Sequence, residues 1–247
     1  MKKFLFLAVS LIVCATVVLA TAATSSRSTQ RDFFQTIQAG GTSALINEMH
    51  PALIDQIDAP VLDAWVDAVH RELGDVTDIQ QTAFHTSVTN EQTTIQSTAT
   101  ITFERGTATS ELTTVDGKIV GFDITSKRLI NWLTEPTSTE IYESRGKRFL
   151  MEMLSGNPQQ ARAMVHQGLK DVITLEQLTA MATQLQSQSD SQVTPTITAK
   201  SASMNPEKEA PELLVQFEIV DGDQTRQAEV AFQFEGMKGH ILGFQIR

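Results

Sequence analysis

The hydrophobic positions of the chain follow a helical period first and a strand period afterwards, and this order occurs twice. In the first half, apolar residues recur at spacings of three and four. The glycine pair at 40–41 should end a first helix, Thr42 should cap a second, and Pro60 should open a third that stops at Gly74. The apolar faces of these helices are Phe33, Phe34 and Ile37; then Leu45, Ile46, Met49, Leu53 and Ile57; then Leu62, Trp65, Val66, Val69 and Leu73.

The second half predicts helices in the same order. Asn157 and Pro158 form an N-cap and a first-turn proline, and Thr174 with Gln177 has the spacing of a capping box. The apolar faces that follow these two signals are Met164, Val165, Leu169 and Ile173, and then Leu178, Met181 and Leu185.

After each set of helices the hydrophobic period changes to two. The segments "TTIQSTATITF" (93–103) and "ELLVQFEIV" (212–220) alternate apolar and polar residues, as half-buried strands do. Asp116-Gly117 and Asp221-Gly222 are hairpin turn signals. Helices followed by hairpins predict an α+β fold, with helices laid across one face of a curved antiparallel sheet in each half.

The ends of the two halves carry the same strand. "DGKIVGFDI" (116–124) and "KGHILGFQI" (238–246) align at an offset of 122, with Gly121-Phe122 matched to Gly243-Phe244. The fronts of the halves align at an offset of 116, which pairs His50 with His166. A matched start and a matched end indicate a tandem duplication.

The two offsets differ by six residues, and the sequence places the insertions around "NPEKEAP" (205–211). The predicted organisation is a first domain over 30–126, a linker over 127–144 and a second domain over 145–247, with the same strand order in both domains. The linker would contain Tyr142, the chain's single tyrosine.

The N-terminus predicts export. Two lysines precede an apolar run over 4–23, and Ala20 and Ala22 supply the small residues of a signal peptidase site. We therefore interpret 1–23 as a signal peptide, with a mature N-terminus near Ala22 or Ala23 and a periplasmic or secreted location. The alternative is an uncleaved anchor formed by residues 4–23, which are numerous enough to span a bilayer. Lipidation at Cys14 is disfavoured, because the bulky Val13 precedes it.

Composition narrows the functions further. Of the 247 residues only Cys14 is a cysteine, so the mature chain contains none, which excludes disulfides, thiolate catalysis and cysteine metal sites. Without the two signal-peptide lysines, 17 basic residues remain against 29 acidic ones. Such a chain repels phosphate backbones and anionic lipid, so we expect neither nucleic acid nor a membrane surface as a partner.

The pattern resembles the nuclear transport factor 2-like superfamily, whose domains are cones of curved sheet closed by helices, and within it a bacterial branch of unknown function. The resemblance rests on Phe33, Gly40, Leu53, Leu62, Trp65, Gly74, Phe103, Gly106 and the 116–124 strand. It covers nearly all of each half, although the second half has Met181 in place of Trp65 and no glycine corresponding to Gly74. The resemblance implies two tandem cone-shaped domains and no particular chemistry; similar domains sometimes accompany hydrolases or wall-synthesis enzymes as accessory modules.

Enzymes of that superfamily use the mouth of the cone, and the chain offers few groups for such a site. Tyr142 lies in the predicted linker, which removes the usual donor of an isomerase-like site. His85 and Asp123 are expected on strand surfaces. Motifs for zinc, calcium, phosphate loops and nucleophilic serines are absent from the sequence, so we predict no metal, cofactor or catalytic residue.

His50 and His166 stand out because they occupy equivalent positions. They are either polar groups at the cone mouths or helix-end histidines with a structural role. With Trp65, they are the candidate ligand-binding residues, and the first cone is the expected binder, with Trp65 and His50 nearest its opening.

Two functions remain compatible with these residues. One is an exported noncatalytic module that binds a small apolar ligand or a protein partner. The alternative is a small-molecule lyase, isomerase or hydrolase that uses a cone cavity.

Overall fold

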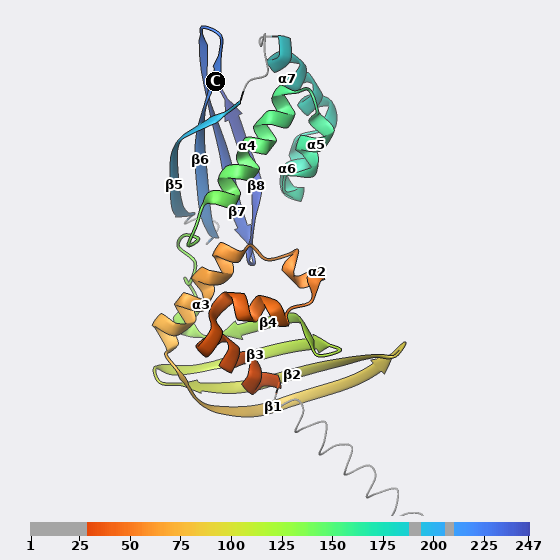
Figure 1. Ribbon diagram of the computed structural model, residues 1–247, viewed down its shortest axis with the longest axis vertical. Helices are drawn as coiled ribbons and strands as arrows, with labels where there is room; N and C mark the ends of the chain where they lie inside the picture. Colours follow the sequence, from red (N-terminus) through yellow and green to blue (C-terminus); the bar gives the residue numbers. More distant parts are fainter. Residues whose placement is uncertain (1–28, 188–193, 206–209) are drawn as a thin grey trace, which may run out of the picture. The chain divides into compact units, whose positions relative to one another are not determined.

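The computed structural model describes residues 29–187, 194–205 and 210–247 (Figure 1). The predicted signal peptide lies outside these residues. Helices followed by a four-stranded antiparallel sheet occur twice along the chain, which confirms the α+β class. Contacts divide the chain into unit 1, residues 1–56 and 65–132, and unit 2, residues 57–64 and 133–247. Each unit is described separately below.

The helices of unit 1 begin with a helical run over 29–48, followed by α2 (Pro51–Ile54) and by α3 (Ala59–Leu73), whose first residues belong to unit 2. The run does not end at the glycine pair as the sequence predicted. Gly41 adopts a φ of 61°, so the run bends there and continues to residue 48. The predicted second helix is also too long, because it breaks at residues 49 and 50 ahead of Pro51.

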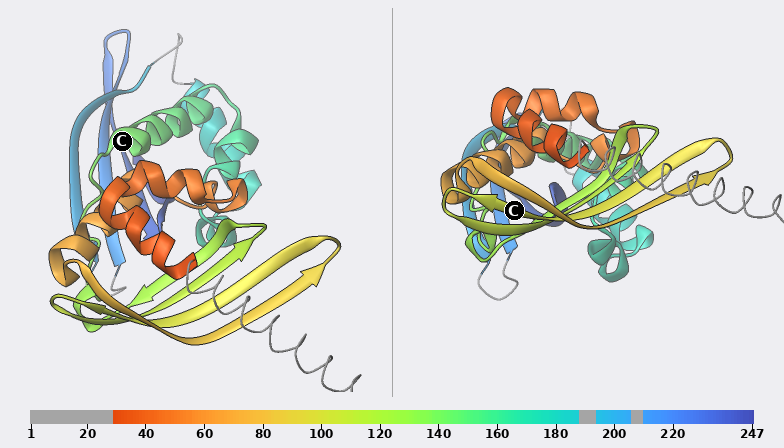
Figure 2. Two further views of the ribbon diagram at one scale, coloured as in Figure 1. Left: turned by 60° about the horizontal axis from the view of Figure 1, so that its bottom comes forward. Right: turned by 90° about the horizontal axis from the view of Figure 1, so that it is seen from below.

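The sheet of unit 1 consists of β1 (Val76–Thr89), β2 (Gln92–Phe103), β3 (Gly106–Val115) and β4 (Lys118–Thr125), in that order (Figure 2). The helical run lies on one face of this twisted sheet (Figure 2). The apolar face predicted in β2 consists of Ile95, Ala99, Ile101 and Phe103; the last three are buried and Ile95 is partly exposed. Phe103 meets Phe34 of the helical run with ring centroids 5.8 Å apart, and this contact joins the helical and sheet layers.

Unit 2 contains α4 (Glu140–Leu154), α5 (Pro158–Ala163), α6 (Gln167–Val172) and α7 (Leu175–Ser187). The capping box ahead of α7 is confirmed: Gln177 N–H donates to Thr174 Oγ1 over 3.2 Å, and Thr174 N–H donates to Gln177 Oε1 over 2.8 Å. Tyr142 belongs to α4 rather than to a linker, and its side chain is completely buried.

The sheet of unit 2 consists of β5 (Thr196–Asn205), β6 (Ala210–Asp221), β7 (Gln224–Glu235) and β8 (Lys238–Ile246). Its strand order is the same as in unit 1. The predicted apolar face of β6 is confirmed by the burial of Leu213, Val215, Phe217 and Ile219.

Irregularities of the two sheets fall at corresponding places. The register shifts between Gln81 and Ala83 in β1, and between Ile197 and Ala199 in β5, 116 residues later. It shifts again between Thr113 and Thr114 in β3, and between Ala231 and Phe232 in β7, 118 residues later. Bulges are specific local features, so their recurrence allows the halves to be aligned residue by residue.

This alignment locates the six additional residues of the second half. Two residues separate the paired Thr89 and Gln92, whereas four separate Asn205 and Ala210. The predicted insertion site at 205–211 therefore accounts for two residues. The other four lengthen the β7–β8 hairpin, where eight residues separate the paired Phe232 and Ile241, against four between Thr114 and Ile119.

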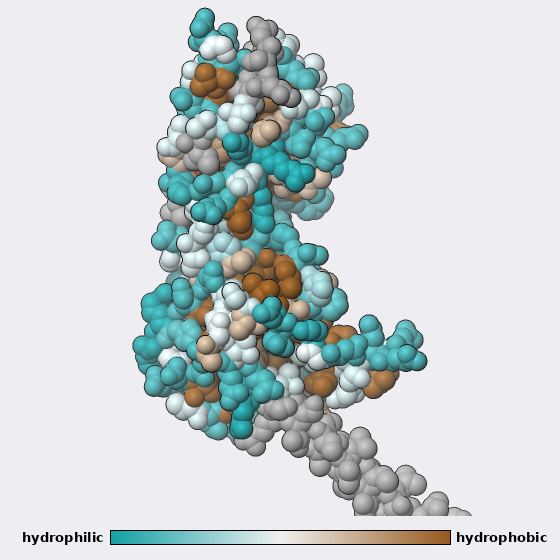
Figure 3. Space-filling model, viewed as in Figure 1, coloured by the Kyte–Doolittle hydropathy of each residue, from teal (hydrophilic) through white to brown (hydrophobic). Residues whose placement is uncertain are grey.

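Polar residues cover most of the face drawn in Figure 3, with apolar residues in small patches. Within the described ranges, no helix combines the length and the apolar character needed to cross a membrane.

Candidate functional site

Unit 1 contains a cleft of about 650 Å³ between the helical run and strands β2 to β4, here called the unit 1 cleft. Its floor is apolar and includes the buried side chains of Phe33, Leu45, Leu112 and Ile119. A cleft with an apolar floor and a few polar groups at its edge is the usual form of a small-molecule site.

The polar edge of the unit 1 cleft is acidic. Asp32 and Glu48 come from the helical run and Asp116 from the β3–β4 turn, and all three are exposed. The Asp116 carboxylate is fixed, because its Oδ1 accepts the Thr93 N–H over 2.8 Å. Asp32 and Glu48 have no hydrogen-bond or ion-pair partner among the described residues, so both carboxylates are available to a ligand.

A buried polar network lies between the helical run and strands β2 and β3 of unit 1. Gln30 Nε2 donates to Ser97 Oγ over 3.0 Å and to Ser97 O over 3.2 Å, and Ser110 Oγ donates to Gln30 Oε1 over 3.0 Å. Ser97 Oγ in turn donates to Leu112 O over 3.4 Å. These polar groups form hydrogen bonds with one another, so they stabilise the fold and are not available to bind or react with a ligand.

Trp65 and His50 do not line the unit 1 cleft. Trp65 is only 4% exposed and packs against Phe122, with ring centroids 5.2 Å apart. His50 lies at the start of α2, where its Nδ1 accepts the Ala52 N–H over 3.2 Å. Trp65 is therefore a core residue, and His50 is an N-cap.

His166 has the same structural role in unit 2, because its Nδ1 accepts the Gly168 N–H over 3.0 Å at the start of α6. Both histidines also donate a backbone N–H to the last strand, His50 to Ile119 O and His166 to Ile241 O. His166 differs in one respect: its Nε2 lies 2.8 Å from Glu235 Oε2. His166 lines the cleft of unit 2 described below, whereas His50 and Trp65 line neither that cleft nor the unit 1 cleft.

We expect His166→Ala to lower the free energy of unfolding by about 1 kcal/mol, because α6 loses the acceptor for its first turn. His166→Asn should cost less, because an asparagine side chain can also accept that N–H. Urea denaturation measures both changes. His85→Ala, at an exposed position of β1, is the matched control and should change stability by less than about 0.5 kcal/mol. An equal loss for the Ala and Asn variants would contradict the capping role.

The other pair considered from sequence, His85 and Asp123, does not form a site. Both residues are exposed, as expected, and they belong to β1 and β4, the two edge strands of one sheet.

Unit 2 contains an ion pair that the sequence did not reveal. Asp58, whose side chain is 2% exposed, binds Arg145 through two hydrogen bonds, Nη1 to Oδ2 at 2.7 Å and Nη2 to Oδ1 at 2.5 Å. The same Oδ2 accepts the Gly239 N–H over 2.9 Å and the Tyr142 hydroxyl over 3.1 Å. Both Asp58 oxygens are therefore occupied by donors. Gly239 belongs to the segment of the β7–β8 hairpin that is longer than its counterpart in unit 1.

This arrangement is unsuited to acid–base catalysis. Burial alone would raise the pKa of Asp58, but the hydrogen bonds from Arg145, Gly239 and Tyr142 outweigh it and hold the pKa below its usual value. Burial and the Asp58 charge raise the pKa of Tyr142 far above its ordinary value. The carboxylate thus stays ionised and the phenol stays protonated. Neither can exchange a proton near neutral pH, so the ion pair is structural.

Unit 2 also has a cleft of about 600 Å³, the unit 2 cleft, between helices α4 to α6 and strands β7 and β8. The charged residues of its lining are mostly basic, namely Arg145, Arg148, Lys170 and Lys238, and the lining also includes His166 and His240. Glu235 is the one carboxylate in this lining.

Comparison with known proteins adds no functional assignment. No protein-family model matches the chain, and no curated protein matches it.

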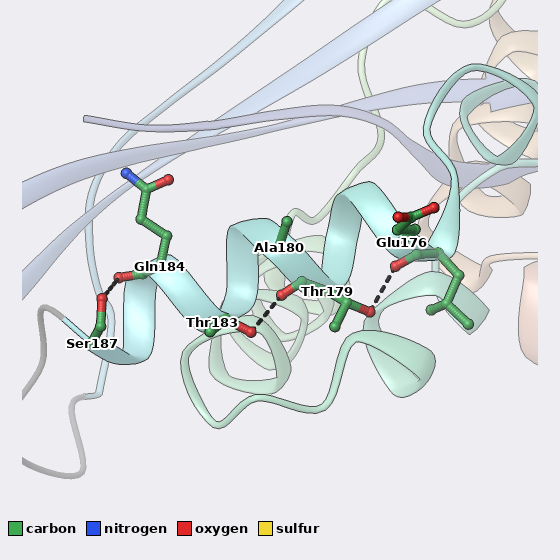
Figure 4. Close-up of a pocket in the computed structure, with 7 residues that line it drawn as sticks. Glu176, Thr179, Ala180, Thr183, Gln184 and Ser187 are labelled. Atoms are coloured by element: carbon green, nitrogen blue, oxygen red, sulfur yellow. Dashed lines mark hydrogen bonds between the residues drawn. The ribbon is translucent and has the colours of Figure 1, made fainter.

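A shallow depression follows one side of α7, along Glu176, Thr179, Ala180, Thr183, Gln184 and Ser187 (Figure 4). Its hydroxyl groups are occupied: Thr179 donates to Leu175 O over 2.7 Å and Thr183 donates to Thr179 O over 2.9 Å. Such bonds turn threonine hydroxyls toward their own helix, so these hydroxyl groups are not available as donors to a ligand. The described residues also contain no cluster of three or more His, Cys, Asp or Glu suited to a metal ion.

Proposed function

We propose that this protein is an exported, noncatalytic binding module that holds a small ligand in the unit 1 cleft. The observation that carries this proposal is the composition of that cleft, an apolar floor under the available carboxylates of Asp32 and Glu48. The ligand class that fits is a small molecule with an apolar body and a cationic group, such as an aromatic or alkyl amine. The apolar body would contact Phe33 and Leu45, and the ammonium group would pair with the rim.

We further propose that the halves are tandem copies of one cone-like domain, similar to the nuclear transport factor 2-like superfamily. The shared strand order, the bulges at corresponding positions and the two capping histidines support a common origin for the two halves. Export rests on the predicted signal peptide over 1–23, and a mature N-terminus near Ala22 or Ala23 would be its direct sign.

A noncatalytic role is preferred because the polar groups near the unit 1 cleft do not form a reacting pair. General acid–base catalysis needs two convergent groups with displaced pKa values. Gln30, Ser97 and Ser110 satisfy one another, and the rim carboxylates are exposed. The alternative of a small-molecule lyase, isomerase or hydrolase would need a reactive pair at this site.

The test is calorimetric titration of the mature protein with benzylamine at fixed ionic strength. We expect binding that weakens roughly fivefold in the double variant Asp32→Asn, Glu48→Gln, because two partly solvated charge contacts are removed. Asp67→Asn, an exposed carboxylate of α3 outside the cleft, is the matched control and should bind as the unmodified protein does.

Equal affinity in the unmodified protein and the double variant would refute the unit 1 cleft as the amine site. Leu45→Trp should separately abolish binding by filling the floor. Chemical conversion of a small substrate, lost when the cleft is filled, would favour the enzymatic alternative.

A further inference from the structure

The basic character of the unit 2 cleft is unexpected in a chain with 29 acidic and 19 basic residues. Arg148, Lys170 and Lys238 bring positive charge to one cleft, and Arg145 lies beside them with its charge matched by Asp58. The single carboxylate of the lining, Glu235, lies 2.8 Å from His166 Nε2. Even without Lys238 and Arg145, the two cations Arg148 and Lys170 outnumber the single carboxylate of the lining.

Several donors in this cleft are available. The Arg148 side chain is 70% exposed, and its Nε lies 3.9 Å from Glu152 Oε1, beyond hydrogen-bond distance. The Lys170 ammonium and the His240 ring have no hydrogen-bond partner among the described residues. Burial, together with the nearby His166, lowers the pKa of His240, so its ring is neutral near pH 7 and can donate one N–H.

The floor of this cleft is apolar. Val165, Phe232 and Ile241 are all buried, and Met164 is partly exposed beside them. A cleft of about 600 Å³ is larger than a bare inorganic ion requires, and its apolar floor gives an organic group something to contact.

We propose that the unit 2 cleft binds an oxyanion, a carboxylate or a phosphate, carried by a small organic molecule. Arg148 and Lys170 would bind the oxyanion through charge-assisted hydrogen bonds, with the His240 N–H as a neutral donor. Arg145 would hold one side of the cleft in place, because Asp58 and Gly239 O fix its guanidinium. This ligand is opposite in charge to the amine proposed for unit 1, and the proposal does not depend on that amine.

Alignment of the two halves supports a difference in ligand charge. Met49 bridges to Ile119 in unit 1, and Val165 bridges to Ile241 in unit 2, so these two residues correspond at an offset of 116. At the same offset, Arg148 corresponds to Asp32, and Met164 corresponds to Glu48. A carboxylate of the unit 1 rim is thus replaced by a guanidinium, and a second carboxylate is replaced by an apolar side chain. The charge of the cleft edge is thus reversed at one corresponding position and removed at another.

The test uses three anions and one cation with related bodies: phenyl phosphate, benzoate, inorganic phosphate and benzylamine. Each is titrated into the mature protein at constant ionic strength, because salt screens exposed charges. We expect phenyl phosphate or benzoate to bind more tightly than inorganic phosphate, since only the organic anions contact the apolar floor. The stronger of the two identifies the type of oxyanion.

The variants locate the site. The double variant Arg148→Gln, Lys170→Gln should bind the preferred organic anion roughly tenfold more weakly, and its affinity for benzylamine should be unchanged. Lys147→Gln is the matched control, because Lys147 neighbours Arg148 on α4 but does not line the cleft.

Three results would overturn the proposal: no binding of either organic anion at millimolar concentration, equal binding by the double variant, or loss of binding in Lys147→Gln. Thermal denaturation without ligand verifies that the variants fold. If benzylamine fails to bind while phenyl phosphate binds at the unit 2 cleft, only the function proposed for unit 1 is refuted.

Discussion

Asp58→Asn should lower the free energy of unfolding of unit 2 by about 3 kcal/mol. The change removes the charge that matches Arg145 and replaces an oxygen acceptor with an amide group, while the Tyr142 hydroxyl and the Gly239 N–H still point at the same place. Breaking one side of a buried ion pair is costly because the other charge stays in the fold without compensation. We take the lower end of the usual range because the Arg145 side chain is 34% exposed and water can reach it.

Urea denaturation followed by circular dichroism measures this loss. Asp67→Asn is the control, since Asp67 is exposed on the same helix, α3, and should change stability by less than about 0.5 kcal/mol. Adding Arg145→Met to Asp58→Asn should recover part of the loss, because the uncompensated cation is then gone. A loss below about 1 kcal/mol for Asp58→Asn alone would mean that the pair contributes no more than an exposed one.

Asp58 and its hydrogen-bond partner Tyr142 make the stability of unit 2 depend on pH. The pKa of Asp58 is lower in the folded state than its ordinary value of 3.8, so its contribution is complete above that value and is lost as the pH falls through the folded pKa. The pKa of Tyr142 is raised from 10.0, so stability also decreases as the pH rises above 10. Asp58→Asn should therefore weaken the loss of stability at low pH, and Tyr142→Phe should remove the loss of stability above pH 10.

Gln30→Leu should destabilise unit 1 by about 2 kcal/mol. The substitution leaves the Ser110 hydroxyl without its acceptor and removes the donor to Ser97 Oγ, in a region where all three side chains are buried. A buried polar group without a partner loses its hydration and gains nothing in return.

The triple variant Gln30→Leu, Ser97→Ala, Ser110→Ala tests whether the loss comes from unsatisfied groups. With all three polar partners replaced, stability should return to within about 1 kcal/mol of the unmodified protein, because no buried donor remains unpaired. If the triple variant is as unstable as the sum of the single variants, shape and not hydrogen bonding is the cause.

The features predicted correctly are those whose signals are local in sequence. The α+β class followed from the change of period, the buried face of β2 from its alternation, and the capping box from Thr174 and Gln177, three residues apart. In each case the interacting residues are neighbours on one helix or one strand, so spacing alone identifies them.

The errors have a common physical origin in tertiary contacts. The glycine pair bends the helical run without ending it, and the second helix breaks ahead of Pro51, where Met49 bridges to Ile119 in β4, 70 residues away. The partners of Asp58 are distant in sequence, since Arg145 follows it by 87 residues and Gly239 by 181. No local sequence pattern marks either partner. The helical spacing of Trp65 predicts a core position, which its burial against Phe122 confirms, but the expected place of Trp65 near a ligand site is not borne out by the unit 1 cleft.

Unit 2 is made from two separate stretches of sequence, residues 57–64 and 133–247. Limited proteolysis or recombinant expression that isolates the C-terminal part from residue 133 onward would therefore remove residues 57–64, which carry Asp58 and the start of α3. Arg145, Tyr142 and the Gly239 N–H would all lose the carboxylate that now satisfies them. Truncation at the midpoint of the sequence thus yields an incomplete folding unit. Residues 57–64, added as a separate peptide or fused through a linker, would restore the missing part.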